Sequence, residues 1–248
     1  MNELATTSVA PSVTLSATCR LWLVDLDQPC DEATAAMLSD DEKARAGRFV
    51  FDKDRRRFVT ARCALRQRLS AETGEAPAAL RFAYGAFGKP SLADHPHCAF
   101  NLSHAGATAL IGIVPASARR QGIVDIGVDI EAARSFPGLS SLAEASFHPD
   151  DIEAFMQATD PTSAFFHGWT RREACLKALG TGLSSLHAIP ATGVGVGAAT
   201  ILASAETGPL SLSIESFQTS PGVFAAVACA SSVPSVTRSP RACVELLS

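Results

Sequence analysis

The sequence contains no apolar run of about eighteen residues, the length that a membrane-spanning helix needs. Its N-terminus, Met1 to Thr18, lacks the basic start and apolar centre of a signal peptide. No C-x-x-C pair occurs among the seven cysteines, and their odd number and scattered positions fit neither a disulfide framework nor a zinc site. We therefore expect a cytoplasmic protein without a membrane partner, whose residues 1–18 form a loose extension.

Basic residues do not dominate the composition either. The formal net charge is −4 at pH 7, which argues against a general nucleic-acid binder. Nine of the 21 lysines and arginines nevertheless fall between Arg45 and Arg68. One basic segment in an acidic protein suits a phosphorylated small molecule or an acidic protein partner.

Hydrophobic periodicity predicts two halves with the same order of elements, in which a strand is followed by helices and then by further strands. Ser39 and Glu42 have the spacing of a capping box at the start of the first helix. The first half should contain strands at 20–26, 80–84, 99–102 and 109–114, and helices at 39–49 and 54–71. The second half should contain strands at 123–130, 192–202, 210–217 and 223–230, and helices at 139–145, 149–157 and 162–179.

This order indicates an α+β fold made of two similar α/β halves. We expect a junction near Arg119–Gly122, with an N-terminal half at residues 19–121 and a C-terminal half at 122–248. The 248 residues are enough for one or two domains, each with its own core.

Two carboxylates share one face of an expected strand. Asp129 and Glu131 are two residues apart in the segment GVDIE, so both project from the same side of the strand. Adjacent carboxylates raise each other's pKa unless a cation lies between them. Oxygen ligands in this arrangement suit Mg²⁺, which takes the rest of its shell from water and phosphates. The alternative is a strand end with two solvated carboxylates.

An expected helix carries a second group of functional side chains. Trp169, Glu173 and Lys177 are spaced four residues apart and therefore form one stripe. Glu173 could supply a third carboxylate or a base, and Lys177 could bind a phosphate. The alternative is an ordinary Glu–Lys pair on a solvated face, although tryptophan on the same stripe favours burial.

Two shorter segments add hydrogen-bond donors. Ser103 and His104 follow an expected strand, where both side chains could face phosphate oxygens. Lys89 lies between Gly88 and Pro90, in a turn whose backbone is constrained. The alternatives are a structural histidine and an ordinary surface lysine.

Together these motifs resemble those of the phosphopantetheinyl transferases of the surfactin type. The resemblance covers about residues 20–230, and its motifs are RFVFDKDRRRF (48–58), GKP (88–90), FNLSH (100–104), GVDIE (127–131) and WTRREACLK (169–177). Members of this family transfer the phosphopantetheine arm of coenzyme A (CoA) to a serine of an apo acyl or peptidyl carrier protein and release 3′,5′-ADP. The resemblance implies a monomer whose two halves are related by a pseudo-twofold axis, with CoA in the cleft between them.

The resemblance also implies roles for individual residues. Mg²⁺ would be bound by the three carboxylates Asp129, Glu131 and Glu173. Glu173, directly or through a metal-bound water, would be the base, and Lys177 would stabilise charge on the pyrophosphate. The other CoA contacts would be Arg45, Arg57, Lys89, Ser103 and His104.

Three positions depart from the family pattern. Arg172 replaces the usual lysine before the helical glutamate, Ala105 replaces a serine after the histidine, and an upstream lysine that is common in the family is either replaced by Glu42 or absent. Two other functions stay open: a non-catalytic relative that binds CoA or a carrier protein, and an unrelated metal-dependent phosphotransferase or hydrolase. The sequence has neither a Walker A motif nor H-E-x-x-H, which weakens the second of these.

Overall fold

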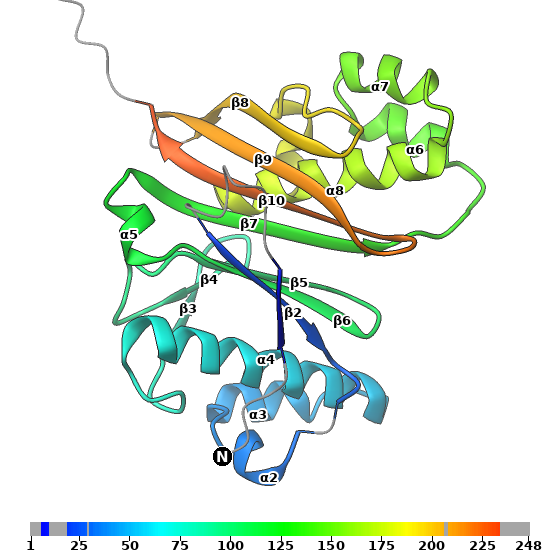
Figure 1. Ribbon diagram of the computed structural model, residues 1–248. Helices are drawn as coiled ribbons and strands as arrows, with labels where there is room; N and C mark the ends of the chain where they lie inside the picture. Colours follow the sequence, from blue (N-terminus) through cyan, green and yellow to red (C-terminus); the bar gives the residue numbers. More distant parts are fainter. Residues whose placement is uncertain (1–5, 10–18, 29, 206–207, 234–248) are drawn as a thin grey trace, which may run out of the picture.

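Two four-stranded antiparallel sheets form the centre of the protein, and helices cover their outer faces (Figure 1). The computed structural model describes residues 6–9, 19–28, 30–205 and 208–233. The first sheet has the strand order β1-β2-β6-β5 and the second has the order β7-β10-β9-β8. No helix in these described segments has the length and apolar character to cross a membrane.

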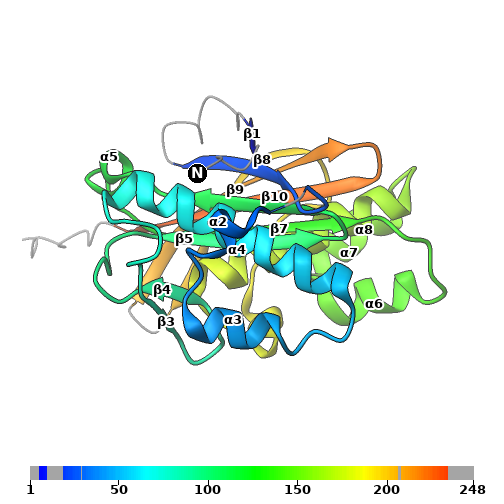
Figure 2. The ribbon, with the colours of Figure 1, turned by 90° about the horizontal axis from the view of Figure 1, so that it is seen from below.

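The first half builds its sheet from β1 (Thr6–Val9), β2 (Arg20–Asp25), β5 (Phe100–Ala105) and β6 (Thr108–Ile113). Its helices are α2 (Glu32–Ala35), α3 (Asp40–Ala46) and α4 (Asp52–Thr73). They lie in front of the strands when the molecule is seen from below (Figure 2). A small hairpin, β3 (Phe82–Tyr84) and β4 (Pro90–Leu92), follows α4. Buried α4 residues such as Leu65 and Leu69 pack with Ile111 of β6, which explains why this helix covers the sheet.

The second half follows α5 (Ala116–Arg119) and begins with β7 (Ile123–Ala132). Its helices are α6 (Leu139–Ser146), α7 (Pro149–Met156), α8 (Pro161–Leu179) and the 3₁₀ helix η1 (Leu183–Ala188). Its remaining strands are β8 (Gly197–Ala205), β9 (Gly208–Ser220) and β10 (Val223–Ser232). The glycine stop expected after α8 is confirmed, because Gly180 has φ 70° and caps the helix.

The mixed helix and sheet content confirms the predicted α+β class. Most boundaries lie within three residues of the predicted ones, and two of the differences have a clear physical reason. The helix expected to reach Phe49 ends at Ala46, because Gly47 caps it and the Phe49 ring turns to contact Phe58, 5.4 Å between centroids. The strand expected from residue 192 begins at Gly197 instead. The amides of Thr192 and Gly193 donate to the Asp151 carboxylate, 2.9 and 2.7 Å, so they do not donate to a neighbouring strand.

The N-terminal extension contains a strand that was not predicted. Thr6–Val9 pairs antiparallel with β2, so the expectation of a loose extension is wrong for these four residues. The rest of residues 1–18 lies outside the described part of the chain. The elements α2, β4 and α5 were also missed, since three or four residues show too little periodicity to detect.

The alternation of β7 gives each of its faces a separate role. Ile126, Val128 and Ile130 face the first sheet and belong to the core between the two sheets. Gly127 and Asp129 therefore face α8. A Cβ atom on Gly127 would lie 2.0 Å from the carbonyl oxygen of Ala174 and 2.4 Å from the amide nitrogen of Ala178. The glycine lets the helix lie directly on the strand backbone.

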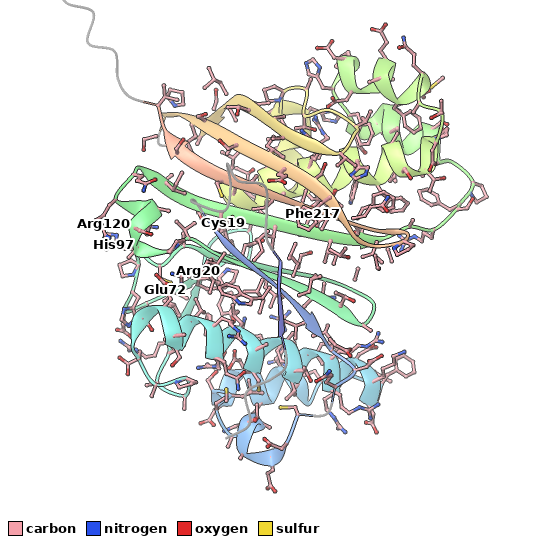
Figure 3. The ribbon with its side chains drawn as sticks, in the orientation of Figure 1. Cys19, Arg20, Glu72, His97, Arg120 and Phe217 are labelled. Carbon is pink, nitrogen blue, oxygen red and sulfur yellow. The ribbon has the colours of Figure 1, made fainter. Side chains whose placement is uncertain are left out.

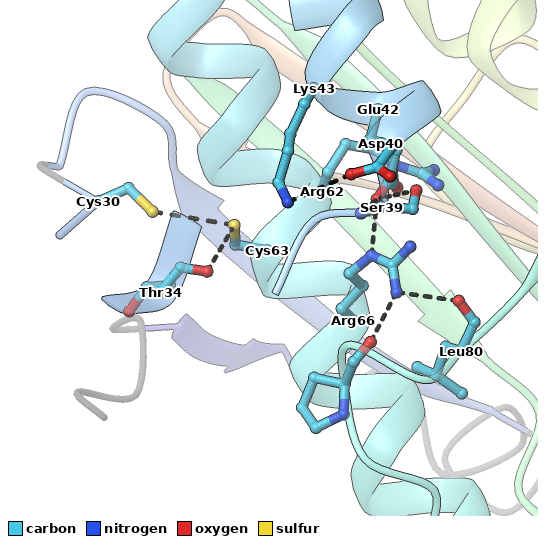
Figure 4. A network of polar contacts seen from close by, with 11 residues as sticks. Cys30, Thr34, Ser39, Asp40, Glu42, Lys43, Arg62, Cys63, Arg66 and Leu80 are labelled. Carbon is cyan, nitrogen blue, oxygen red and sulfur yellow. Dashed lines mark hydrogen bonds and ion pairs between the residues drawn. The ribbon is translucent and has the colours of Figure 1, made fainter. Parts of the chain in front are cut away.

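Buried charges in the first half form a compensated network (Figure 4). Glu42 accepts hydrogen bonds from Arg62 at 2.5 Å, from Arg66 at 2.7 Å and from the Ser39 amide at 3.0 Å. The last contact confirms the predicted capping box. Burial raises the pKa of the Glu42 carboxyl, but the two arginines outweigh it and hold that pKa below its ordinary value of 4.5.

A Gly127→Ala substitution should destabilise the protein strongly, because backbone atoms of α8 occupy the place of the new methyl group. We expect a loss in the free energy of unfolding of at least about 3 kcal/mol, the upper end for overpacked cores. Gly195→Ala is the matched control, since nothing lies within 4 Å of the place that its Cβ atom would take and its φ is not positive. Urea unfolding measures the free energy of unfolding of both variants. Equal stability of the two would contradict the close packing of α8 on Gly127.

Glu42→Gln should cost about 3–5 kcal/mol, because it leaves Arg62 and Arg66 buried without a counter-charge. Asp40→Asn on the same helix should cost at most about 1 kcal/mol, because its partner Lys43 is exposed. The folded-state pKa of Glu42 is lowered, so its contribution is complete above pH 4.5 and is lost as the pH falls through that lowered pKa. The difference in the free energy of unfolding between wild type and Glu42→Gln, measured with urea, should therefore become smaller at acidic pH.

Candidate active site

Side chains from β5, β7 and α8 meet in one polar cluster. The Ser103 hydroxyl donates to Asp129 Oδ1 at 2.9 Å. The Lys177 ammonium donates to the same Asp129 oxygen at 2.5 Å and to Ser103 Oγ at 3.2 Å. These residues come from three of the motifs singled out in the sequence, and they are up to 74 positions apart along the chain. The cluster lies where the two halves of the protein touch.

Asn101 holds the two halves together at this point. Its side-chain oxygen accepts a hydrogen bond from the Val128 amide at 2.9 Å, and both residues are buried. β5 and β7 are edge strands of different sheets, so this side-chain bond replaces the backbone ladder that would join strands of one sheet. Ser103, two residues further along β5, therefore faces Asp129. Asn101 was not among the predicted site residues, although its two-residue spacing from Ser103 on a strand was a usable signal.

Three carboxylates at this position are poorly neutralised. Burial raises the pKa of Asp129, even though Lys177 and Ser103 bond to it. Burial and the charge of Asp129 raise the pKa of Glu131. Burial also raises the pKa of Glu173, where repulsion from Asp129 and Glu131 acts against the attraction of Lys177. The structure therefore brings the three predicted acidic residues close enough to influence one another's ionisation.

The polar cluster offers oxygen donors, although the described residues do not form a metal site there. Asp129 Oδ2 is buried and has no hydrogen-bond partner among the described residues, an arrangement that is costly unless something binds the oxygen. No group of three or more His, Cys, Asp or Glu side chains in the described segments is placed so that it could hold a metal ion. The donors on Asp129, Glu131 and Glu173 are all oxygen atoms, which is the ligand type that Mg²⁺ prefers.

A cavity of about 420 Å³ carries three of the predicted CoA contacts, Arg45, Arg57 and His104. Arg57 donates from Nε and Nη2 to the two oxygens of Asp27, at 2.7 and 2.8 Å. The Arg45 guanidinium lies over the Phe58 ring, 5.3 Å from its centroid. Asp27 was missed by the sequence analysis, since a pairing across 30 residues leaves no local signal. We refer to this cavity as the arginine cavity.

Lys89 has a different environment from these three residues. Gly88 and Pro90 line the arginine cavity, whereas the Lys89 ammonium forms an ion pair with Asp125 at 2.7 Å. It also donates to the carbonyl oxygen of Ile126 at 3.1 Å.

A larger cavity, of about 480 Å³, lies elsewhere and is lined by none of the predicted site residues. Its wall includes Glu72, His97 and Arg120, which are labelled in Figure 3. Glu72 is held there by an ion pair with Arg20 at 3.2 Å.

Two of the three departures from the family pattern, Arg172 and Glu42, have structural explanations. Arg172 is buried and donates to the carbonyl oxygens of Leu186 and Ile189, at 2.6 and 3.1 Å, so its charge does not reach the polar cluster. Glu42 neutralises the buried arginines of α4. Trp169 on the predicted stripe stacks on Phe165 at 6.0 Å between centroids, which makes it part of the core beneath the site.

Known proteins resemble this chain over both halves. A model of the 4′-phosphopantetheinyl transferase superfamily matches residues 125–229, and a model of the 4′-phosphopantetheinyl transferase N-terminal region matches residues 28–115. The 4′-phosphopantetheinyl transferase HetI of Nostoc sp. is 40% identical over 187 residues, which cover 72% of this chain and 76% of HetI. A putative 4′-phosphopantetheinyl transferase of Synechocystis sp. is 35% identical over 169 residues, 66% of each chain. The human L-aminoadipate-semialdehyde dehydrogenase-phosphopantetheinyl transferase is 29% identical over 161 residues, 59% of this chain and 49% of that protein.

Mg²⁺ should raise the thermal stability of the wild-type protein, because an ion that binds only the folded state stabilises it. Glu173→Gln should abolish this increase in Tm, and Glu144→Gln on the exposed face of α6 should keep it. Without Mg²⁺ at neutral pH, Glu173→Gln should be at least as stable as wild type. The folded-state pKa of Glu173 is raised, so its ionisation opposes folding as the pH rises, and glutamine removes that penalty. Equal Mg²⁺ responses in all three proteins would exclude a metal at this cluster.

Proposed function

Because the chain belongs to the 4′-phosphopantetheinyl transferase superfamily, we propose that it transfers the phosphopantetheine arm of CoA to a serine of an apo acyl or peptidyl carrier protein. The second product is 3′,5′-ADP. The observation that carries this proposal is the Ser103–Asp129–Lys177 cluster, together with the two further carboxylates whose pKa is influenced by it. A phosphoryl transfer needs cations for the pyrophosphate and a base for the hydroxyl, and the cluster provides residues suited to both.

We propose that the halves, residues 19–121 and 122–248, are related by a pseudo-twofold axis. Each half has a four-stranded antiparallel sheet with a long helix on its outer face, α4 in one and α8 in the other. CoA then binds where the halves meet, at the β5–β7 contact. We also propose that the protein acts as a cytoplasmic monomer; light scattering after gel filtration tests the oligomeric state.

Asp129, Glu131 and Glu173 are the residues that would hold Mg²⁺. Support for this assignment comes from the unpartnered Asp129 oxygen and the raised pKa of each carboxyl group. The ion would neutralise charge on the pyrophosphate of CoA and orient it.

Glu173 is the proposed base for the carrier serine. The serine oxygen forms a bond to the β-phosphorus of CoA, the bond from that phosphorus to the bridging oxygen of 3′,5′-ADP breaks, and the serine proton passes to the Glu173 carboxylate. Burial raises the pKa of Glu173, which makes its carboxylate a stronger proton acceptor than a solvated glutamate.

Lys177 is the proposed cation for the reacting phosphoryl group. Its side chain is 29% exposed, so the ammonium can contact a ligand while it remains beside Asp129. Ser103 and His104 lie at the same end of β5 and would contact phosphate oxygens of CoA. Arg45 and Arg57 would bind the nucleotide end, including its 3′-phosphate, from the arginine cavity.

Incubation with CoA, Mg²⁺ and a panel of apo carrier proteins should produce holo carrier protein, detected by the mass gain of the modified chain. Asp129→Ala and Glu173→Gln should each reduce the rate at least about a hundredfold, the lower bound for losing an acid–base group. Glu144→Gln is the control and should keep wild-type activity.

The same proteins separate a transferase from a non-catalytic binder. Calorimetric titration with CoA should give tighter binding with Mg²⁺ than without it for the wild type. Binding of CoA without any transfer to the whole carrier panel would support the non-catalytic alternative. Full transfer by either acidic variant would overturn the proposed roles of these carboxylates.

A further inference from the structure

The turn between β3 and β4 presents its residues to two different places. Gly88 and Pro90 line the arginine cavity. Lys89, between them, does not line that cavity, and its ammonium forms an ion pair with Asp125 near the start of β7. Gly88 and Pro90 of this turn therefore form part of the cavity wall, whereas Lys89 contacts the second half of the protein.

The partners of the Lys89 ammonium come from two elements. It forms the 2.7 Å ion pair with Asp125 and donates to the Ile126 carbonyl of β7 at 3.1 Å. It also donates to the Ala178 carbonyl of α8 at 3.5 Å. The Ala178 carbonyl belongs to the last turn of the helix, where carbonyls lack intrahelical partners and a cation is favourable.

The Lys89 side chain is only 17% exposed, whereas that of Asp125 is 36% exposed. Burial lowers the pKa of Lys89, and the ion pair with Asp125 acts in the opposite direction. An ammonium that makes three contacts inside the protein has little capacity left for a phosphate. Phe87 of the same turn packs on Gly182, where a Cβ atom would lie 2.7 Å from the ring, so the turn is fixed at two points.

Two residues that Lys89 contacts lie close in sequence to the proposed reacting groups. Ala178 follows Lys177 directly, and Ile126 lies three residues before Asp129. Lys89 therefore bridges α8 and β7 one residue away from the glycine contact that sets their separation. A shift of the helix end would move the Lys177 ammonium relative to Asp129 and Ser103.

We propose that Lys89 is a positioning residue, which acts through Asp125 and the carbonyls of Ile126 and Ala178 to hold α8 against β7, and does not contact CoA. This inference rests on the proposed transferase function. It differs from the role that the family resemblance suggested for Lys89. A CoA contact would affect binding of CoA, whereas a positioning residue affects the rate of the bound complex.

The test compares Lys89→Met, Asp125→Asn and the double variant. Asparagine removes the charge of Asp125 but keeps the oxygen that accepts the Ile126 amide at 2.7 Å. Lys89→Met should lower kcat about tenfold, since small displacements of reacting groups cost one to two orders of magnitude. Asp125→Asn should lower kcat in the same direction, and the double variant should be no slower than Lys89→Met. The KM for CoA and its calorimetric Kd should stay at the wild-type values.

Lys43→Met, which removes an exposed lysine, is the matched control and should change none of these quantities. A Lys89→Met protein with a raised Kd for CoA and an unchanged kcat would overturn the inference, as would wild-type kcat in both single variants. If Lys89→Met does not fold, the kcat of Asp125→Asn and its Kd for CoA test the inference in the same way. A wild-type protein without transfer activity overturns the proposed function instead, and the Kd for CoA then still decides whether Lys89 contacts it.

Discussion

The direct contact between α8 and β7 is the constraint on which the rest of the site depends. At Gly127 the helix backbone comes so close that no side chain fits between the two elements. Alanine residues of β10 such as Ala226 and Ala228 extend this shallow surface beneath the helix. Because the helix lies so low, Lys177 reaches Asp129, and Glu173 is close enough to affect the ionisation of the same cluster.

The buried carboxylates of the protein have two kinds of environment. Those with a structural role are fully paired, and those of the polar cluster are not. Glu42 is surrounded by donors, and its pKa is lowered. The buried Asp151 likewise accepts from Arg172 and from backbone amides. At the polar cluster the carboxylates outnumber their cationic partner, and the pKa of each is raised. One oxygen of Asp129 has no partner in the part of the chain that the structure describes. Carboxyl groups with perturbed pKa values of this kind are concentrated at functional sites.

The contact between the halves explains how distant motifs become one site. β5 and β7 are edge strands of separate sheets. They are joined by the hydrogen bond from the Val128 amide to the Asn101 side chain, and not by the backbone hydrogen bonds of a continuous sheet. The cluster of Ser103, Asp129 and Lys177 lies along the same line of contact. Lys89 adds a second connection from the first half to the end of α8. The arginine cavity is lined by residues of the first half, whereas the three carboxylates belong to the second half.

The amino-acid sequence by itself determined the α+β class, the position of most strands and helices, and the shared face of Asp129 and Glu131, because these follow from local periodicity and from glycine and capping signals. It also contained the motifs that resemble those of the phosphopantetheinyl transferases. Only the tertiary structure decided which charged residues act together. The arginine-rich segment is divided between a buried pair with Glu42 and the arginine cavity, and Lys89 turns away from that cavity. Such choices depend on contacts between residues far apart in the chain, for which sequence spacing carries no geometric information.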